Sequence, residues 1–352
     1  MTSELTQNRY FHASAIGLAL VFAGFRNTIS PDMERYRYFY EHYRSGDYQK
    51  LIEPSFVLIS TALNHLGFDY HALFFLYTFI TIGFIYCAIR NLTGYVKTSM
   101  LFYILVPHLY LDLFIEMRQQ CAVAIVFYTM SLLEVDKVKF RWLKVALLAL
   151  ASISFHYSAA GYWVIYILFS KLIKRKYPSK LYGVALLVSV LTPSSFILYV
   201  AYIALYPVMP PAYQGHITDL MALGAASGEH SITSILIYNS LALAFMFAVK
   251  AMKSLPKFST ELLNIFIIGV IILNITRAYG DMARFADYFI IYEIIFLPFL
   301  LFRIGDLRLR PVMIYGVTLL YFVHFIHGLY YLNAETGTYI FLHYTNALLS
   351  GQ

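Results

Sequence analysis

Charged residues and cysteines are both scarce in this sequence. Charged side chains make up 13% of the 352 residues, about half the usual share in a soluble domain. This composition argues against a water-soluble globule. The two cysteines, Cys87 and Cys121, both lie within apolar runs. Neither a disulfide framework nor a cysteine-based metal site is therefore indicated, and both residues are expected to serve in packing.

Motifs for nucleotide and metal chemistry are also missing. The sequence contains no glycine-rich phosphate loop, zinc-ligand cluster or nucleophile elbow, so coupling to ATP is not indicated. The net charge of +7 comes from short basic clusters between apolar runs, and membrane topology explains such clusters better than binding to nucleic acid. We therefore expect no cofactor, no metal and no nucleic-acid partner.

Long apolar runs dominate the chain, in which 60% of residues are hydrophobic. The runs continue from residue 11 to residue 331 and predict a single transmembrane domain over residues 1–352, an all-α bundle. A membrane span needs about 20 mostly apolar residues, and about eleven segments are candidates. They are 11–25, 70–89, 98–114, 118–133, 143–155, 158–170, 181–206, 231–249, 260–276, 285–302 and 311–331.

Two features of these candidates affect the topology. The first, 11–25, lacks a cleavage site and is expected to remain as a signal anchor. The pair 143–155 and 158–170 is short, so it forms either two tilted helices or a hairpin that dips into the bilayer without crossing it.

Positively charged loops set the predicted orientation. Lys and Arg gather in alternate loops, which are cytoplasmic by the positive-inside rule. The segments 207–230 and 332–352 contain neither residue and fall on the other side. The N-terminus is therefore expected in the cytoplasm and the C-terminus outside. The basic residues of the inner loops are Arg90, Lys97, Lys137, Lys139, Arg141, Lys144, Lys171, Lys174, Arg175, Lys176, Lys180, Lys250, Lys253, Lys257, Arg303, Arg308 and Arg310.

Several arginines fall on the outer side, against this bias. Arginine grips phosphate oxygens with two parallel hydrogen bonds, so an anionic phosphate ligand at the outer surface is one explanation. Pairing with nearby carboxylates is the other, and it is favoured for Arg35, Arg37 and Arg44. The outer arginines are Arg26, Arg35, Arg37, Arg44, Arg118, Arg277 and Arg284.

The outer segment 26–69 contains two candidate features. Asp32, Tyr36 and Tyr40 recur at helical spacing and form a polar, aromatic face of the kind that binds sugars, although interfacial tyrosine belts have the same pattern. Glu53 precedes an apolar segment, 55–66, that is too short to cross the membrane. Glu53 either caps that helix, with Pro54 in its first turn, or takes part in catalysis.

Three further groups stand at predicted span ends. Arg118 begins a span, where a helix N-terminus and a guanidinium together suit an anion. His156 lies at the break between two short helices, and broken helices line cavities. Its imidazole is suited to act as a general base or acid. The last group recurs at steps of three and four, which predicts one helical face or a salt-bridge ladder: Arg277, Asp281, Arg284 and Asp287.

Together these residues resemble the EpsG family of Wzy-like bacterial polysaccharide polymerases over nearly the whole chain. The departures are small: Ser55 stands where the family commonly has leucine, and Gln120-Cys121-Ala122 stands where an alanine-rich run often follows. The matching motifs are F-R-x5-D-x3-Y (Phe25, Arg26, Asp32, Tyr36), E-P with a later Phe (Glu53, Pro54, Phe56), R-Q (Arg118, Gln119), F-H-x-S (Phe155, His156, Ser158) and R-x6-R-x3-Y (Arg277, Arg284, Tyr288).

The resemblance implies polymerisation of undecaprenyl diphosphate-linked oligosaccharide repeat units at the outer face of the bacterial inner membrane. The fold it implies is similar to that of GT-C type glycosyltransferases. Lipid-linked oligosaccharide would be both donor and acceptor, membrane lipid would surround the protein, and a chain-length regulator is a candidate partner.

The implied site residues have distinct expected roles. The donor diphosphate would be held by arginines, without a metal, and His156 or Glu53 would take the acceptor proton. Asp32 would orient sugar hydroxyls. The arginines are Arg118, Arg277 and Arg284, and the further substrate-binding residues are Arg26, Tyr36, Gln119 and Tyr288.

Three other functions are compatible with part of this pattern. A glycan ligase would use the same donor with another acceptor. A transporter or flippase of lipid-linked sugars should have paired repeats and ionisable residues near mid-span, whereas these charges gather at span ends. A membrane acyltransferase would centre on His156 and leaves the outer arginines unexplained.

Overall fold

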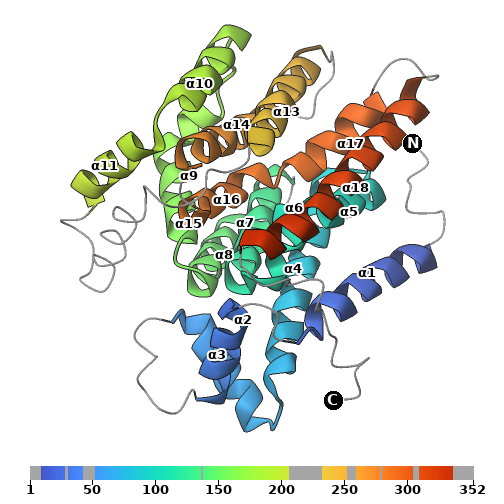
Figure 1. Ribbon diagram of the computed structural model, residues 1–352, viewed down its shortest axis with the longest axis vertical. Helices are drawn as coiled ribbons and strands as arrows, with labels where there is room; N and C mark the ends of the chain where they lie inside the picture. The colour runs from blue at the N-terminus through green and yellow to red at the C-terminus, as the bar shows by residue number, and fades with distance from the viewer. Residues whose placement is uncertain are drawn as a thin grey trace. The chain divides into compact units, whose positions relative to one another are not determined.

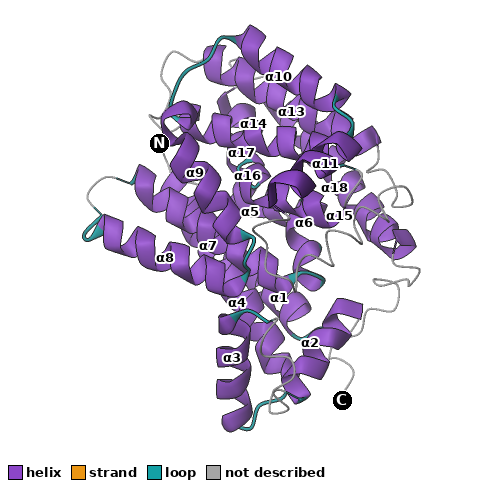
Figure 2. Cartoon of the chain, turned by 90° about the vertical axis from the view of Figure 1, so that its left-hand side faces the viewer, coloured by secondary structure: helices purple, strands orange, loops and turns teal. Residues whose placement is uncertain are grey.

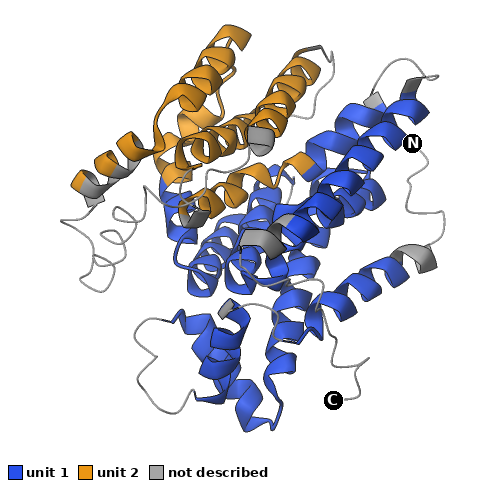
Figure 3. Ribbon diagram, viewed as in Figure 1, with its two compact units in different colours: residues 1–164, 294–352 blue, residues 165–293 orange. Residues whose placement is uncertain are grey.

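The computed structural model describes residues 9–27, 31–42, 52–135, 138–205, 232–251, 259–277, 280–303 and 309–335 (Figure 1). Every secondary-structure element in these ranges is a helix, which confirms the all-α prediction (Figure 2). The chain divides into two compact units, residues 1–164 with 294–352 and residues 165–293 (Figure 3). The predicted single transmembrane domain stays a prediction.

The first unit holds the N-terminal helices and the last two. Helix α9 (Ala159–Ile173) crosses the boundary between the units. The helices of the first unit are α1 (Arg9–Gly24), α2 (Pro31–Glu41), α3 (Pro54–His65), α4 (Tyr70–Leu92), α5 (Val96–Leu105), α6 (Pro107–Tyr110), η3 (Asp112–Phe114), α7 (Met117–Glu134), α8 (Arg141–Phe155), α17 (Glu293–Arg303, whose first residue belongs to the second unit) and α18 (Leu309–Glu335). Those of the second are α10 (Ser179–Leu191), α11 (Ser194–Leu205), α13 (Ile232–Ala251), α14 (Ser259–Thr276), α15 (Gly280–Ala283), η5 (Arg284–Ala286) and α16 (Asp287–Ile290).

Helix α7 is the centre of the first unit and packs against α4 and α8. Its side chains are buried along nearly the whole helix, and many of them are small, including Cys121, Ala122 and Ala124. Small side chains let neighbouring helices approach closely in a membrane protein. Cys121 is a buried packing residue, as predicted, and both cysteines are free thiols, although Cys87 is exposed.

Among the residues that the structure describes, two helices are long and apolar enough to cross a membrane, or three if one bent pair counts as a single span. The two are Tyr70–Leu92 and the segment Arg310–Tyr330 of α18. Shorter apolar helices of 10–17 residues make up much of the rest of the described chain. These candidate spans indicate a helical membrane protein. Within the described ranges, full-length spans are fewer than the sequence predicts, and the topology stays a prediction.

Several predicted spans are wrong as single helices because the chain turns within them. The segment 98–114 is divided into α5, α6 and η3, and 181–206 is divided between α10 and α11. Pro107 and Pro193 stand at these breaks. Proline has no backbone N–H and disfavours helix in the residue before it, so an apolar run interrupted by proline need not continue as one helix.

Two predictions of short helices are confirmed, whereas their position on the outer side stays a prediction. Helix α3 covers Pro54–His65, with Pro54 in its first turn, and the break between α8 and α9 falls at His156. The segment 207–230, predicted as an outer loop, and the C-terminal residues from 336 onward lie outside the described residues.

Candidate functional site

Glu53 joins two residues that are far away in the sequence. Its Oε1 lies 2.8 Å from Nδ1 of His156, and its Oε2 forms an ion pair with Nη1 of Arg118. Glu53 is the N-cap residue of α3, Arg118 lies in the first turn of α7, and His156 is the C-cap residue of α8. All three belong to the first unit, and we call them the Glu53 cluster.

The predicted capping role of the Glu53 side chain is wrong. Glu53 occupies the N-cap position of α3, but its side chain makes no capping hydrogen bond. The carboxylate is instead turned to Arg118 and His156 and is only 4% exposed as a residue. A guanidinium carries a full positive charge, whereas a helix N-terminus carries only a partial one, so the ion pair with Arg118 is the stronger attraction for the carboxylate.

The cluster keeps Glu53 ionised. Burial by itself would raise the pKa of the Glu53 carboxyl, but the hydrogen bond from His156 and the charge of Arg118 outweigh burial and hold this pKa below its ordinary value. A carboxylate with a lowered pKa is a weak base. It is well suited to orient the imidazole, because it accepts the Nδ1–H proton and leaves a lone pair on Nε2 of His156.

Aromatic rings surround the guanidinium of Arg118. Its Cζ lies 4.9 Å from the ring centroid of Tyr36 and 5.7 Å from that of Phe56. Stacking of this kind favours arginine over lysine. Nε of Arg118 is buried and has no hydrogen-bond partner in the part of the chain that the structure describes. The ion pair with Glu53 explains why a cation stands at the N-terminal end of α7.

Tyr36 is brought to the cluster by α2. Burial raises the pKa of its phenol above the ordinary value, even though the charge of Arg118 acts in the opposite direction. The hydroxyl therefore stays protonated at neutral pH and is able to donate a hydrogen bond. Gln119, which follows Arg118 on α7, is buried. These two predicted substrate-binding residues lie on elements that also carry or contact the cluster.

Arg26 lies in a different environment from Arg118. It is fully buried, and it donates to Leu113 O at 3.0 Å, to Thr78 Oγ1 at 3.3 Å and to Ala23 O. Its guanidinium also lies over the rings of Phe74 and Phe114. These contacts join the end of α1 to α4 and η3, so they are structural. Substrate binding by Arg26 stays a prediction, and it would require the side chain to leave this position.

We expect Arg26→Met to destabilise the protein by about 2 kcal/mol or more, because it leaves buried carbonyl oxygens without donors. Thermal unfolding of the purified protein in detergent measures the change. Arg35→Met is the matched control, because the side chain of Arg35 is 64% exposed. An equal, small shift in both variants would contradict a structural role for Arg26.

The predicted pairing with carboxylates is confirmed for Arg35 and Arg37. Arg35 lies 3.7 Å from Asp32, and Arg37 lies 2.8 Å from Glu41. Asp32 is therefore paired in the structure, and its predicted role with sugar hydroxyls stays a prediction. Arg44 lies outside the described residues.

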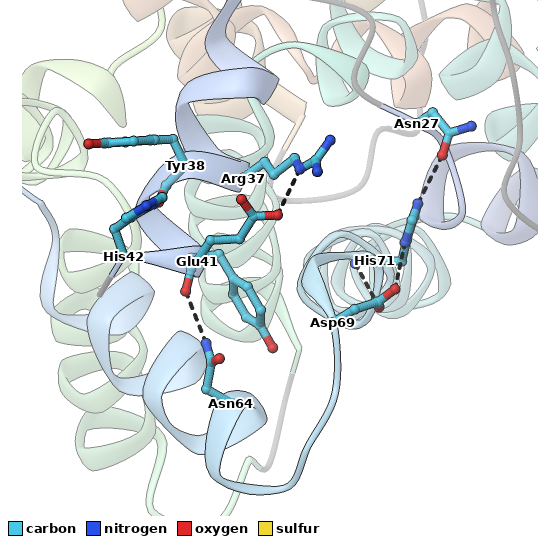
Figure 4. Close-up of polar contacts among 9 residues, drawn as sticks. Asn27, Arg37, Tyr38, Glu41, His42, Asn64, Asp69 and His71 are labelled. Carbon is cyan, nitrogen blue, oxygen red and sulfur yellow. Dashed lines mark hydrogen bonds and ion pairs between the residues drawn. The ribbon is translucent and has the colours of Figure 1, made fainter. Parts of the chain in front are cut away.

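A second polar group lies at the start of α4. Figure 4 shows His71 between Asp69 and Asn27, with Nδ1 2.9 Å from Asp69 Oδ2 and Nε2 3.0 Å from Asn27 Oδ1. Asp69 Oδ1 also accepts from the backbone N–H of His71 and caps α4. This group fixes the entry to α4 and engages both ring nitrogens of His71.

The remaining predicted site residues lie in the second unit. Arg277 donates to Val190 O at 2.6 Å and to Asn274 O at 3.2 Å, at the ends of α10 and α14. A cation at helix C-termini stabilises exposed carbonyls, so Arg277 has a structural role. Arg284 begins η5, and Tyr288 is buried in α16.

The predicted helical face of Arg277, Asp281, Arg284 and Asp287 is not formed by one helix. Helix α14 ends at Thr276, and the chain resumes at Gly280 in the short turns α15, η5 and α16. Glycine has a low helix propensity, which favours a break here. The Asp281 side chain lies outside the described residues.

Some residues at the site were not predicted. Phe56 was noted in the sequence only as part of a motif, and Ser55, Tyr77 and Ser154 carried no signal for a site. Each sits in an apolar run, where no spacing distinguishes it from a packing residue. Within the described ranges, no group of three or more His, Cys, Asp or Glu residues is arranged to hold a metal.

Comparison with known proteins supplies the family. Residues 9–346 match the EpsG family. Neither the comparison with curated proteins nor the comparison with solved structures finds a match. Because the matched region covers nearly the full chain, the protein belongs to the EpsG family, which is linked to exopolysaccharide biosynthesis.

Proposed function

We propose that this protein is a polysaccharide polymerase that joins undecaprenyl diphosphate-linked repeat units at the outer face of the bacterial inner membrane. The observation that carries the proposal is the Glu53 cluster. It combines an oriented imidazole, a carboxylate and a stacked arginine, drawn from three segments of a membrane protein in a family linked to polysaccharide synthesis.

In the proposed reaction, an acceptor sugar hydroxyl attacks the anomeric carbon of the donor glycan. Nε2 of His156 takes the hydroxyl proton, while Glu53 holds the ring through Nδ1. The new glycosidic C–O bond forms as the bond to the diphosphate breaks, and the electron pair leaves with undecaprenyl diphosphate. The growing glycan thereby moves onto the next lipid-linked unit.

Arg118 stabilises the leaving diphosphate in this proposal. Its Nη1 pairs with Glu53, so the phosphate oxygens must meet another part of the guanidinium. The side chain of Arg118 is 19% exposed, which leaves part of it open to a ligand. A fixed donor aimed at developing charge lowers the barrier of the step. Roles for Arg277 and Arg284 at the diphosphate stay predictions from the sequence.

A reaction with one substrate tests the function. Purified protein incubated with lipid-linked repeat units alone, without nucleotide or added metal, should yield a ladder of longer lipid-linked glycans when products are resolved by size. Units that remain single, but are transferred when another acceptor is added, would show a ligase. Units that only change leaflets in sealed vesicles would show a flippase.

The lowered pKa of Glu53 predicts a pH dependence of stability. The pKa of Glu53 in the folded protein lies below its ordinary value of 4.5. The ionised Glu53 therefore contributes fully to folding stability above the ordinary value, and this contribution is lost as the pH falls through the folded-state pKa. Glu53→Gln should remove this acid-side loss. Unfolding temperatures of both proteins measured from about pH 3 to about pH 7 should therefore converge as the pH falls. A constant difference would contradict the ionised pair.

A further inference from the structure

A buried hydrogen bond connects the two chain segments that carry Glu53 and His156. The hydroxyl of Ser55 donates to the carbonyl oxygen of Ser154 over 2.7 Å, and Ser55 is buried. Ser154 lies in the last turn of α8, where carbonyl groups lack partners within the helix. The Ser55 hydroxyl therefore satisfies an acceptor that the helix itself leaves open.

The position of this bond relates it to the site. Ser55 comes two residues after Glu53, and Ser154 comes two residues before His156. The bond thus ties the first turn of α3 to the last turn of α8 beside the Glu53–His156 contact. Both segments belong to the first unit.

Helix α4 also packs against the contact between α3 and α8. The hydroxyl of Tyr77, a fully buried residue, lies 3.5 Å from Ser55 Oγ. The ring of Tyr77 packs edge-on against Phe155, the neighbour of His156, with 5.3 Å between centroids. Ser55 is therefore held between α4 and α8 in a defined orientation.

We propose that Ser55 is a positioning residue, which fixes the carboxylate of Glu53 against the imidazole of His156 through its bond to Ser154. The assignment of this contact to catalysis rests on the proposed function, whereas the positioning itself does not. A misplacement of about 1 Å between reacting groups is enough to lower the rate by about a hundredfold. The hydrogen bond from Ser55 to Ser154, which lies next to the Glu53–His156 pair, is therefore expected to affect the rate.

Ser60 provides a matched control on the same helix. It is fully buried, and its hydroxyl has no hydrogen-bond partner in the part of the chain that the structure describes. Ser55→Ala and Ser60→Ala thus make the same chemical change at two buried positions of α3, and only the first removes a hydrogen bond.

The kinetic test compares these variants. We expect Ser55→Ala to lower kcat by about tenfold and to change KM by less than about twofold. Its pH profile of stability should lose part of the decrease on the acid side, because a weaker bond from His156 lets the pKa of Glu53 return toward its ordinary value. The other titratable groups near Glu53, Arg118 from α7 and Tyr77 from α4, are unchanged. Ser60→Ala should match the wild type.

A structural readout separates this inference from the proposed function. In nitrogen-15 histidine-labelled protein, the NMR signal of the His156 ring, assigned by its loss in His156→Gln, should shift in Ser55→Ala and stay in place in Ser60→Ala. The shift would support positioning even if the wild type formed no polymer, an outcome that overturns only the proposed function.

Two further variants keep the inference testable if Ser55→Ala folds poorly. Ser55→Cys nearly keeps the volume and weakens the donor, so it should give a partial loss, whereas Ser55→Thr keeps the hydroxyl and should retain activity. If Ser55→Cys leaves kcat, the pH profile and the His156 signal at wild-type values, the inference is wrong.

Discussion

His156→Ala should lower turnover by about a hundredfold or more while leaving binding of the lipid-linked substrate intact, because it removes the group that accepts the proton. The variant should also lose the acid limb of the pH profile. Polymer formation and substrate binding, measured on the same purified protein, check both parts.

His71→Ala is the matched control for this variant. His71 also contacts a carboxylate, Asp69, at 2.9 Å, but it lies outside the Glu53 cluster and fixes the entry to α4 (Figure 4). We expect it to affect stability more than turnover. Equal losses of turnover in both variants would indicate a general effect of removing a histidine.

Glu53→Gln distinguishes the two candidate bases. If Glu53 only orients His156, the amide oxygen still accepts the Nδ1–H, and turnover should fall less than in His156→Ala. The loss of charge next to Arg118 makes some reduction unavoidable. An inactive, folded Glu53→Gln beside an active His156→Ala with an unchanged pH profile would assign the base to Glu53.

Arg118→Lys should also lower turnover by about a hundredfold, with protein levels near normal. An ammonium is able to pair with Glu53, which preserves the charge balance of the buried cluster. It lacks the planar edge needed for two parallel contacts to a diphosphate, and it cannot stack on Tyr36 and Phe56 as a guanidinium does.

Arg37→Lys is the control for this change. Arg37 pairs with Glu41 on the exposed side of α2, so lysine should serve there without loss of turnover. A wild-type rate in Arg118→Lys would show that a simple positive charge suffices, and it would refute the two-pronged contact to phosphate.

The sequence by itself determined the features that depend on local spacing and composition. Apolar runs and scarce charge specified a helical membrane protein, and Pro54 together with the short segment after it specified α3. Salt bridges between residues three or four apart, such as Arg35 with Asp32, follow from helix periodicity alone. The family motifs follow from the sequence for the same reason, because they are read from the order of residues.

Only the tertiary structure decided which candidates meet. Glu53 and His156 are 103 positions apart, and Glu53 and Arg118 are 65 apart, so no helical period relates them. Their contact depends on how α3, α7 and α8 pack. The same packing buried Arg26 among backbone carbonyls and turned Glu53 away from capping. Sequence spacing encodes neighbours within one helix, whereas neighbours on different helices are set by the packing of whole faces.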